Sequence, residues 1–287
     1  MSLDIRRLGP SLGAEIRGVD LAQPVDADTV GEIARAFDEH GVLVFRGQAI
    51  DDRAHARFAA HFGPLGTFRH LADPHGKVRE IFRLANTDAA GNLLPADDAH
   101  LRLLELNGLW HSDSSYRQVP TRGSVLRAVV VPDSGGDTLF ADMAAAYETL
   151  PATMRRRIAG LYARHSLEFL VTSRGLPALG AEELARIPPV EHPLVREHAS
   201  GRCSLFLSPP YMEAIVGWSP AASRALIAEL TDWATRERYT YRHHWQRDDL
   251  VMWDNGWTMH KVLPYDIARC RRVMHGTTLL GGSAHAA

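Results

Sequence analysis

Short apolar runs that end at turn-forming residues are the feature that most constrains the fold of this chain. The clearest runs are Val42–Phe45, Ser124–Val131 and Leu250–Trp253. Runs of about four to eight such residues predict buried strands, because helices in globular proteins are usually longer. Strand-like runs occur near both ends of the chain, with helical patterns between them. The sequence therefore predicts a mainly β fold with helices, in which a jelly-roll core (a double-stranded β-helix) is decorated by α-helices.

The helices are predicted from apolar residues at helical spacing and from residues that favour helix ends. An aspartate can accept hydrogen bonds from the free N–H groups at a helix start, and a glycine often follows the last turn. The predicted helices are one that starts at Asp26 or Asp28 and ends at Gly41, one from Asp51 or Asp52 to Gly63, Ala141–Leu150, one from Pro151 to Leu161, and one from Ser219 through Trp233.

No internal repeat, low-complexity tract or clear linker divides the chain, so we expect a single domain over residues 1–287. Two segments interrupt the regular patterns. Residues 85–109 contain scattered Asp, Asn, Gly and Pro residues and predict a long loop that delivers the residues after it to a functional site. Residues 169–190 are also rich in Gly and Pro, with a short helical piece, and could form a lid over that site.

Composition narrows the class of partner. Lys and Arg number 32 and Asp and Glu number 34, so the net charge of −2 gives no basic surface for nucleic acid or anionic membranes. No run of about 18 apolar residues predicts a membrane span, and the first residues lack a signal-peptide core. The two cysteines, Cys203 and Cys270, exclude a disulfide framework. We expect a cytoplasmic protein that acts on a small molecule, with homo-oligomer formation left open.

One short segment carries candidate metal ligands. His111 and Asp113 are two residues apart in an extended stretch, where alternate side chains point the same way. One imidazole and one carboxylate are two of the three ligands in the 2-His-1-carboxylate triad that holds Fe(II). His260, which is 260 − 111 = 149 residues further on, follows a predicted strand and turn and is the best candidate for the third ligand. A zinc hydrolase with the same three residues is an alternative from another enzyme class.

Two adjacent arginines, Arg271 and Arg272, lie at the start of the last predicted strand. Neighbours on a strand face opposite ways, so only one of them can point into the apolar interior. A buried arginine needs an anionic partner, because an unpaired buried charge is very costly. That partner can be an acidic side chain of the chain itself or a dicarboxylate cosubstrate, which a planar guanidinium can bind with two parallel hydrogen bonds.

Together these residues resemble the motifs of a known enzyme family. Over nearly its whole length the chain is similar to the Fe(II)- and 2-oxoglutarate-dependent dioxygenases of the taurine dioxygenase group, and within that group to the 2,4-dichlorophenoxyacetate (aryloxyalkanoate) dioxygenases. The motifs that carry the resemblance lie at 110–116, 135–138, 253–260 and 271–275. The resemblance implies an enzyme that uses Fe(II), 2-oxoglutarate and O2 to hydroxylate a small organic substrate, with an aryloxyalkanoate-like acid favoured, and that releases succinate and CO2.

The resemblance also implies roles for single residues. His111, Asp113 and His260 would bind the iron and form the catalytic centre. Arg272 would pair with the distal carboxylate of 2-oxoglutarate, and Thr138 would donate a hydrogen bond to it. The residues that fall where relatives contact the substrate are Arg69, His70, Asn107 and Ser114. Ordinary loop polarity is the competing explanation for these four.

One position departs from the family pattern. The taurine and 2,4-dichlorophenoxyacetate enzymes carry an arginine four residues after the one matching Arg272, where this chain has Gly276. Counting by two along the strand places Gly276 on the face of Arg272, so we expect it to open a void onto the same pocket. Taurine would then not be turned over, and the substrate would be bulkier or would place its acid elsewhere. Candidates for a different anion site are Arg69, His70, Arg102 and Arg174.

Overall fold

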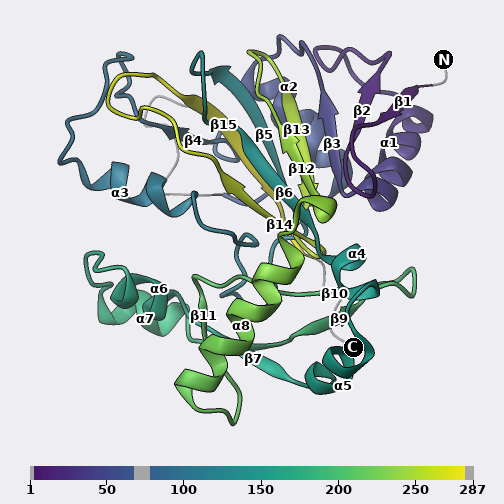
Figure 1. The fold of residues 1–287 in the computed structure, drawn as a ribbon. Helices are drawn as coiled ribbons and strands as arrows, with labels where there is room; N and C mark the ends of the chain where they lie inside the picture. The colour runs from purple at the N-terminus through teal and green to yellow at the C-terminus, as the bar shows by residue number, and fades with distance from the viewer. Residues whose placement is uncertain (1–2, 68–77, 282–287) are drawn as a thin grey trace.

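The computed structural model describes residues 3–67 and 78–281, and a seven-stranded sheet forms its upper part in Figure 1. The strand order is β1-β2-β3-β13-β5-β15-β4, and neighbours are antiparallel except for the parallel pair β2–β3. The bounds are β1 Asp4–Arg7, β2 Ala14–Arg17, β3 Val42–Phe45, β4 Phe82–Ala85, β5 Gly123–Val130, β13 Leu250–Asp254 and β15 Val273–Leu279. Strands from both ends of the chain therefore share one sheet.

A three-stranded sheet faces the larger one and closes the core between them. Its order is β12-β6-β14, with bounds β6 Thr138–Asp142, β12 Thr240–His243 and β14 Thr258–Val262. The ring of Phe140 on β6 lies 5.6 Å from the ring of Trp253 on β13, centroid to centroid. Both belong to an apolar cluster that includes Leu126 and Met274 of the large sheet. Two sheets that pack face to face around one core form the predicted jelly roll.

The other face of the large sheet is covered by α1 (Ala27–His40) and α2 (Asp52–Ala59), which continues into the 3-10 helix η1 (Ala60–Phe62). Asp26 and Asp51 accept backbone hydrogen bonds at the two helix starts, as predicted. Gly41 ends α1 with φ 65°, a conformation that glycine adopts without steric cost. Phe37 and Phe58 are fully buried between these helices and the sheet.

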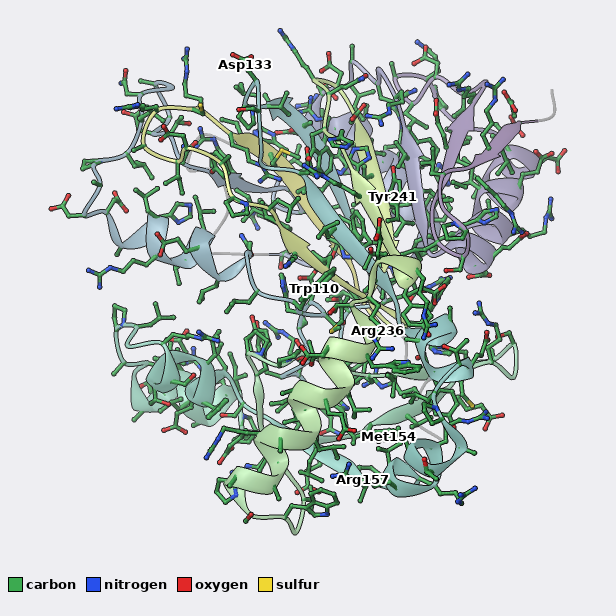
Figure 2. The ribbon with its side chains drawn as sticks, viewed as in Figure 1. Trp110, Asp133, Met154, Arg157, Arg236 and Tyr241 are labelled. Carbon is green, nitrogen blue, oxygen red and sulfur yellow. The ribbon has the colours of Figure 1, made fainter. Side chains whose placement is uncertain are left out.

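A second group of elements lies below the two sheets in Figure 1 and has its own apolar cluster, which includes Leu194 and Leu226. Its small sheets have the orders β11-β7-β8 and β10-β9. The bounds are α4 Met143–Glu148, α5 Ala152–Ile158, β7 Tyr162–His165, α6 Leu167–Ser173, α7 Ala181–Arg186, β8 Val190–Pro193, β9 Val195–Glu197, β10 Cys203–Leu205, β11 Met212–Ile215, α8 Pro220–Ala234 and η2 Glu237–Tyr239. Trp110 lies where this group meets the sheets (Figure 2).

The connecting segments contain more helix than the sequence predicts. The predicted loop 85–109 contains a helix, α3 (Ala99–Leu106), which Asp98 caps. Leu101 is its one buried residue, so α3 shows little of the apolar periodicity from which helices are predicted. The segment 169–190 includes most of α6 as well as the predicted short helix α7. Ser166 caps α6, but the Gly and Pro residues that follow this helix dominate the local pattern.

The helices of the described residues are short. The longest, α8, has 15 residues, and none within 3–67 and 78–281 is both long and apolar enough to cross a membrane. Cys203 and Cys270 are free cysteines.

Candidate metal centre

Two histidines that are far apart in the sequence lie side by side. His260 lies in the middle of β14, and His111 pairs with it in an antiparallel bridge. The N–H of His111 donates to the carbonyl of His260 at 3.0 Å, and the N–H of His260 donates back at 2.8 Å. Their imidazole rings are 4.2 Å apart, centroid to centroid. Backbone pairing therefore fixes the relative position of the two predicted ligands.

Asp113 completes the group from the extended segment that follows His111. Its Oδ1 lies 3.6 Å from the Nε2 atom of each histidine. One ligand atom from each of the three side chains lies within 4.8 Å of the others. The next residue, Ser114, turns the chain with a positive φ of 57°. The three predicted ligands thus converge on one point where a single ion can bind.

The protonation states of these side chains suit a divalent cation. His111 donates from Nδ1 to the carbonyl of Leu109 at 2.7 Å, so Nε2 is the ring nitrogen that faces Asp113 and can bind an ion. Burial lowers the pKa of His260 to about 3, which leaves the imidazole neutral. Burial alone would raise the pKa of Asp113, but His260, His111 and the Ser124 hydroxyl together hold it well below its usual range. Two neutral imidazoles and one carboxylate are the donor set of the facial triad.

A buried guanidinium defines a second polar site inside the core. Arg272 is 6% exposed, whereas its neighbour Arg271 is exposed, as predicted for adjacent residues. The Nε and Nη2 atoms of Arg272 have no hydrogen-bond partner among the described residues. Burial lowers the pKa of Arg272 to about 10, so it remains a cation at neutral pH. A Cβ on Gly136 would lie 3.4 Å from Nε, so the glycine leaves room beside the guanidinium.

Thr138 lies two residues after Gly136, at the start of β6. Its Oγ1 accepts a hydrogen bond from the indole Nε1 of Trp245 at 2.9 Å. Because indole N–H can only donate, the hydroxyl hydrogen of Thr138 is left available for another acceptor. A cation and a hydroxyl donor are groups that bind a carboxylate.

Comparison with known proteins decides the family. A family model described as "Taurine catabolism dioxygenase TauD, TfdA family" matches residues 4–278 of the chain. The chain belongs to this family. It is therefore a 2-oxoglutarate-dependent dioxygenase that uses Fe(II), 2-oxoglutarate and O2, and the alternative of a zinc hydrolase is wrong.

Individual relatives of the dioxygenase are similar over nearly their full length. An "Alpha-ketoglutarate-dependent 2,4-dichlorophenoxyacetate dioxygenase" of Cupriavidus pinatubonensis is 39% identical, over 97% of this chain and 98% of the relative. An "Alpha-ketoglutarate-dependent sulfate ester dioxygenase" of Pseudomonas putida is 33% identical, over 98% of this chain and 90% of the relative. The crystal structure of AAD-2 in complex with Mn(II) and N-oxalylglycine superposes with a TM-score of 0.89 at 35% identity and covers 100% of both chains.

The void predicted at Gly276 of the dioxygenase is filled. Gly276 pairs with Phe82 across β15 and β4, and a Cβ on Gly276 would lie 2.6 Å from Cζ of the Phe82 ring. It would also lie 3.0 Å from Cδ1 of Leu126. The predicted void is absent because the space beside a residue in a sheet is filled by its cross-strand neighbour. That neighbour cannot be inferred from the sequence of β15 alone. The inner face at Gly276 is therefore an apolar wall.

The other predicted substrate residues are not drawn together in the described part of the dioxygenase. Arg69 and His70 lie outside the described residues. Asn107 ends α3, and its carbonyl accepts the N–H of Val262 at 2.7 Å. Arg102 lines a small surface cavity beside α3, and Arg174 is exposed after α6.

One residue that holds Arg272 in place was not predicted from the sequence. Asn86 is fully buried, and its side-chain oxygen accepts the backbone N–H of Arg272 at 2.8 Å. Its Nδ2 donates to the carbonyls of Ile267 and Cys270 at 2.8 and 2.7 Å, which fixes the segment before Arg272. An asparagine after a strand otherwise indicates only a turn, so no sequence signal distinguishes this role.

Proposed function

We propose that His111, Asp113 and His260 bind the catalytic Fe(II) of this dioxygenase, and that Arg272 and Thr138 bind the distal carboxylate of 2-oxoglutarate. The observation that carries the proposal is the convergence of the three ligand atoms within 4.8 Å, with His260 neutral and the aspartate ionised. The unpartnered nitrogens of Arg272 support the second part. When bound, Fe(II) with 2-oxoglutarate supplies the O2-dependent oxidation of a C–H bond, with release of succinate and CO2.

The roles of this chain's own residues follow from their placement. The two histidines and Asp113 present three donors to one side of an ion and leave the opposite side free. Arg272 and Thr138 orient the cosubstrate by its far end. The apolar cluster that includes Phe140 and Trp253 packs against His260, with the ring of Trp253 4.8 Å from its imidazole, and limits access of water to the site.

For the substrate we favour an aryloxyalkanoate-like acid, because relatives that are 33 to 39% identical over nearly the whole chain are named for 2,4-dichlorophenoxyacetate and (S)-phenoxypropionate. Hydroxylation of the carbon beside the ether oxygen of such an acid gives a hemiacetal, which collapses to a phenol and an oxo acid. Each turnover consumes one 2-oxoglutarate and one O2 and yields one succinate and one CO2.

The wall at Gly276 favours a second candidate, the same chemistry on a substrate that places no acid at this position. Phe82 and Leu126 line the wall, and both are uncharged. A desolvated anion beside them would lack a partner and would lose several kcal/mol, on the order of the cost of an unpaired buried charge. Taurine, whose sulfonate is small and fully charged, is therefore expected not to be turned over.

Succinate release from a substrate panel separates these candidates. The panel contains aryloxyacetates, 2-aryloxypropionates, larger neutral compounds and taurine, with Asp113→Ala and His111→Ala as inactive controls. Preference for an aryloxyalkanoate supports the first candidate, and preference for a neutral compound supports the second. Substantial iron-dependent turnover by either control variant would remove the proposed metal ligands, and efficient turnover of taurine would overturn the inference from Gly276.

Three broader features are part of the same proposal. The chain acts as one domain over residues 1–287, in which the segment 169–190 covers the substrate as a lid. It acts in the cytoplasm, which the free cysteines Cys203 and Cys270 support.

A further inference from the structure

The two oxygens of Asp113 have different neighbours. Oδ1 faces the two histidines at 3.6 Å from each Nε2. Oδ2 accepts a hydrogen bond from the hydroxyl of Ser124 on β5 at 2.6 Å. The inference drawn from this asymmetry rests on the proposed function. It goes beyond the choice of ligands, because it concerns which oxygen of Asp113 would bind the metal.

The hydroxyl hydrogen of Ser124 can be donated to one acceptor only, Oδ2 of Asp113. Ser124 Oγ accepts a hydrogen bond from Nδ2 of Asn255 at 3.2 Å. A serine hydroxyl has a single hydrogen, and an ionised carboxylate can only accept. The amide of Asn255 therefore fills an acceptor position of Ser124 and directs the hydroxyl hydrogen at Oδ2 of Asp113.

The orientation of the Asn255 amide is itself determined by its neighbours. Its Oδ1 accepts from the indole Nε1 of Trp253 at 3.1 Å and from the backbone N–H of Asp113 at 3.4 Å. Both of these groups can only donate, so the amide oxygen must face them and Nδ2 must face the hydroxyls of Ser124 and Thr121. The backbone carbonyl of Asn255 also accepts from Ser112 at 2.7 Å, next to Asp113 in the chain.

We propose that Asn255 and Ser124 are positioning residues that reserve Oδ2 of Asp113 and so keep this carboxylate a one-oxygen ligand. A metal held here by three protein ligands would need its remaining coordination positions for 2-oxoglutarate and O2. A carboxylate that bound through both oxygens would occupy one of these positions. The hydrogen bond from Ser124 therefore preserves the place of the cosubstrate.

Co(II), added in the absence of O2, tests this by two affinities that are measured separately. The first is the affinity of the protein for Co(II), and the second is the affinity of the Co(II)-loaded protein for 2-oxoglutarate. In Ser124→Ala we expect Co(II) binding to be retained and 2-oxoglutarate binding to weaken by about tenfold or more, which corresponds to about 1.4 kcal/mol of binding free energy. The visible bands of bound Co(II), which respond to coordination number, should change in the same variant. Ser124→Thr keeps the hydroxyl and should restore both readouts.

Thr121→Val is the matched control, because it removes the other hydroxyl at Asn255 Nδ2 and leaves Ser124 in place. It should behave as the wild type. If Ser124→Ala does not fold, Ser124→Cys, whose thiol is a weak donor of similar size, should show the same loss of 2-oxoglutarate affinity.

The proposal is overturned if the Ser124 variants bind 2-oxoglutarate as the wild type does, or if they lose Co(II) affinity alone. If the proposed metal ligands are wrong, the result is different, because Asp113→Ala would then bind Co(II) as tightly as the wild type.

Discussion

Two arginines on opposite faces of the large sheet are equally buried, but only one has an internal counter-ion. Arg127 on β5 is 8% exposed, and it donates to the carbonyl of Ile50 at 2.6 Å and to Asp52 at 2.9 Å. Asp52 also accepts from His275 of β15 at 2.7 Å. Arg272 is 6% exposed, and no carboxylate of the described residues lies within ion-pair distance of it.

The difference teaches how to separate a structural cation from a ligand-binding one. The charge of Arg127 is balanced within the fold, and the network ties α2 to the central strands. The charge of Arg272 faces the core between the two sheets, and the proposed function gives it a carboxylate of 2-oxoglutarate as its partner. Burial alone is the same for both, so the presence or absence of an internal carboxylate is what distinguishes them.

The largest expected effect is on cosubstrate binding. Arg272→Gln should weaken 2-oxoglutarate binding by about 30-fold to several thousand-fold, because removing one partner of a buried charge pair costs about 2–5 kcal/mol. Titration of 2-oxoglutarate into the metal-loaded protein measures this. Arg271→Gln is the control, since its side chain is exposed, and equal effects from both variants would contradict the assignment of Arg272.

The next effect is on stability. Arg127→Gln should lower the free energy of unfolding by about 2–4 kcal/mol and leave 2-oxoglutarate affinity unchanged, because Asp52 loses its arginine partner far from the cosubstrate and keeps only His275. Urea denaturation measures the first quantity. Arg122→Gln, which removes an exposed pair with Asp38, should cost less than about 1 kcal/mol. An Arg127 variant that is as stable as this control would mean that the network is not structural.

Lowering the pH should reduce the free energy of unfolding through a buried imidazole near Arg127. Burial, with repulsion by Arg127, lowers the pKa of His55 from 6.5 to about 3 in the folded protein. The unfolded chain takes up the proton first, so the stability that is present above about pH 6.5 is lost as the pH falls towards 3. Between pH 7.5 and 5 the wild type should lose about 2 kcal/mol more than His55→Gln. Equal losses in the two proteins would show that His55 does not carry the effect.

The smallest effect concerns Trp245. Trp245→Phe removes the indole donor to Thr138 and should weaken 2-oxoglutarate binding by about 2- to 10-fold, since a hydrogen bond contributes about 0.5–1.5 kcal/mol. Thr138→Val provides the reference for loss of the hydroxyl itself. If Thr138→Val weakens binding and Trp245→Phe does not, the indole does not orient the hydroxyl.

The parts of the site that could be predicted are those in which local spacing has a direct meaning. The alternation of side chains in an extended segment placed His111 and Asp113 together, and the same rule separated Arg272 from Arg271. The two-sheet core followed from short apolar runs at both ends of the chain. These inferences need only one segment at a time.

The parts that could not be predicted depend on which segments become neighbours. Ser124 reaches Asp113 from 11 residues away and Asn86 reaches Arg272 from 186 residues away, in each case by a hydrogen bond that no spacing rule encodes. The ring of Phe82 fills the space at Gly276 because β4 pairs with β15, and that pairing is not visible in the sequence. Helix α3 was missed because it buries so little of its surface.

The backbone bridge between His111 and His260 has a consequence for dividing the protein in two. A cut between α6 and α7 would leave His111 and Asp113 on one fragment and His260 on the other, so neither fragment would hold all three candidate ligands. Metal affinity would then depend on the two fragments finding each other, and a bound ion would join them as a reversible cross-link. Complementation of the separated halves could accordingly be followed by the recovery of metal binding, without any assay of turnover.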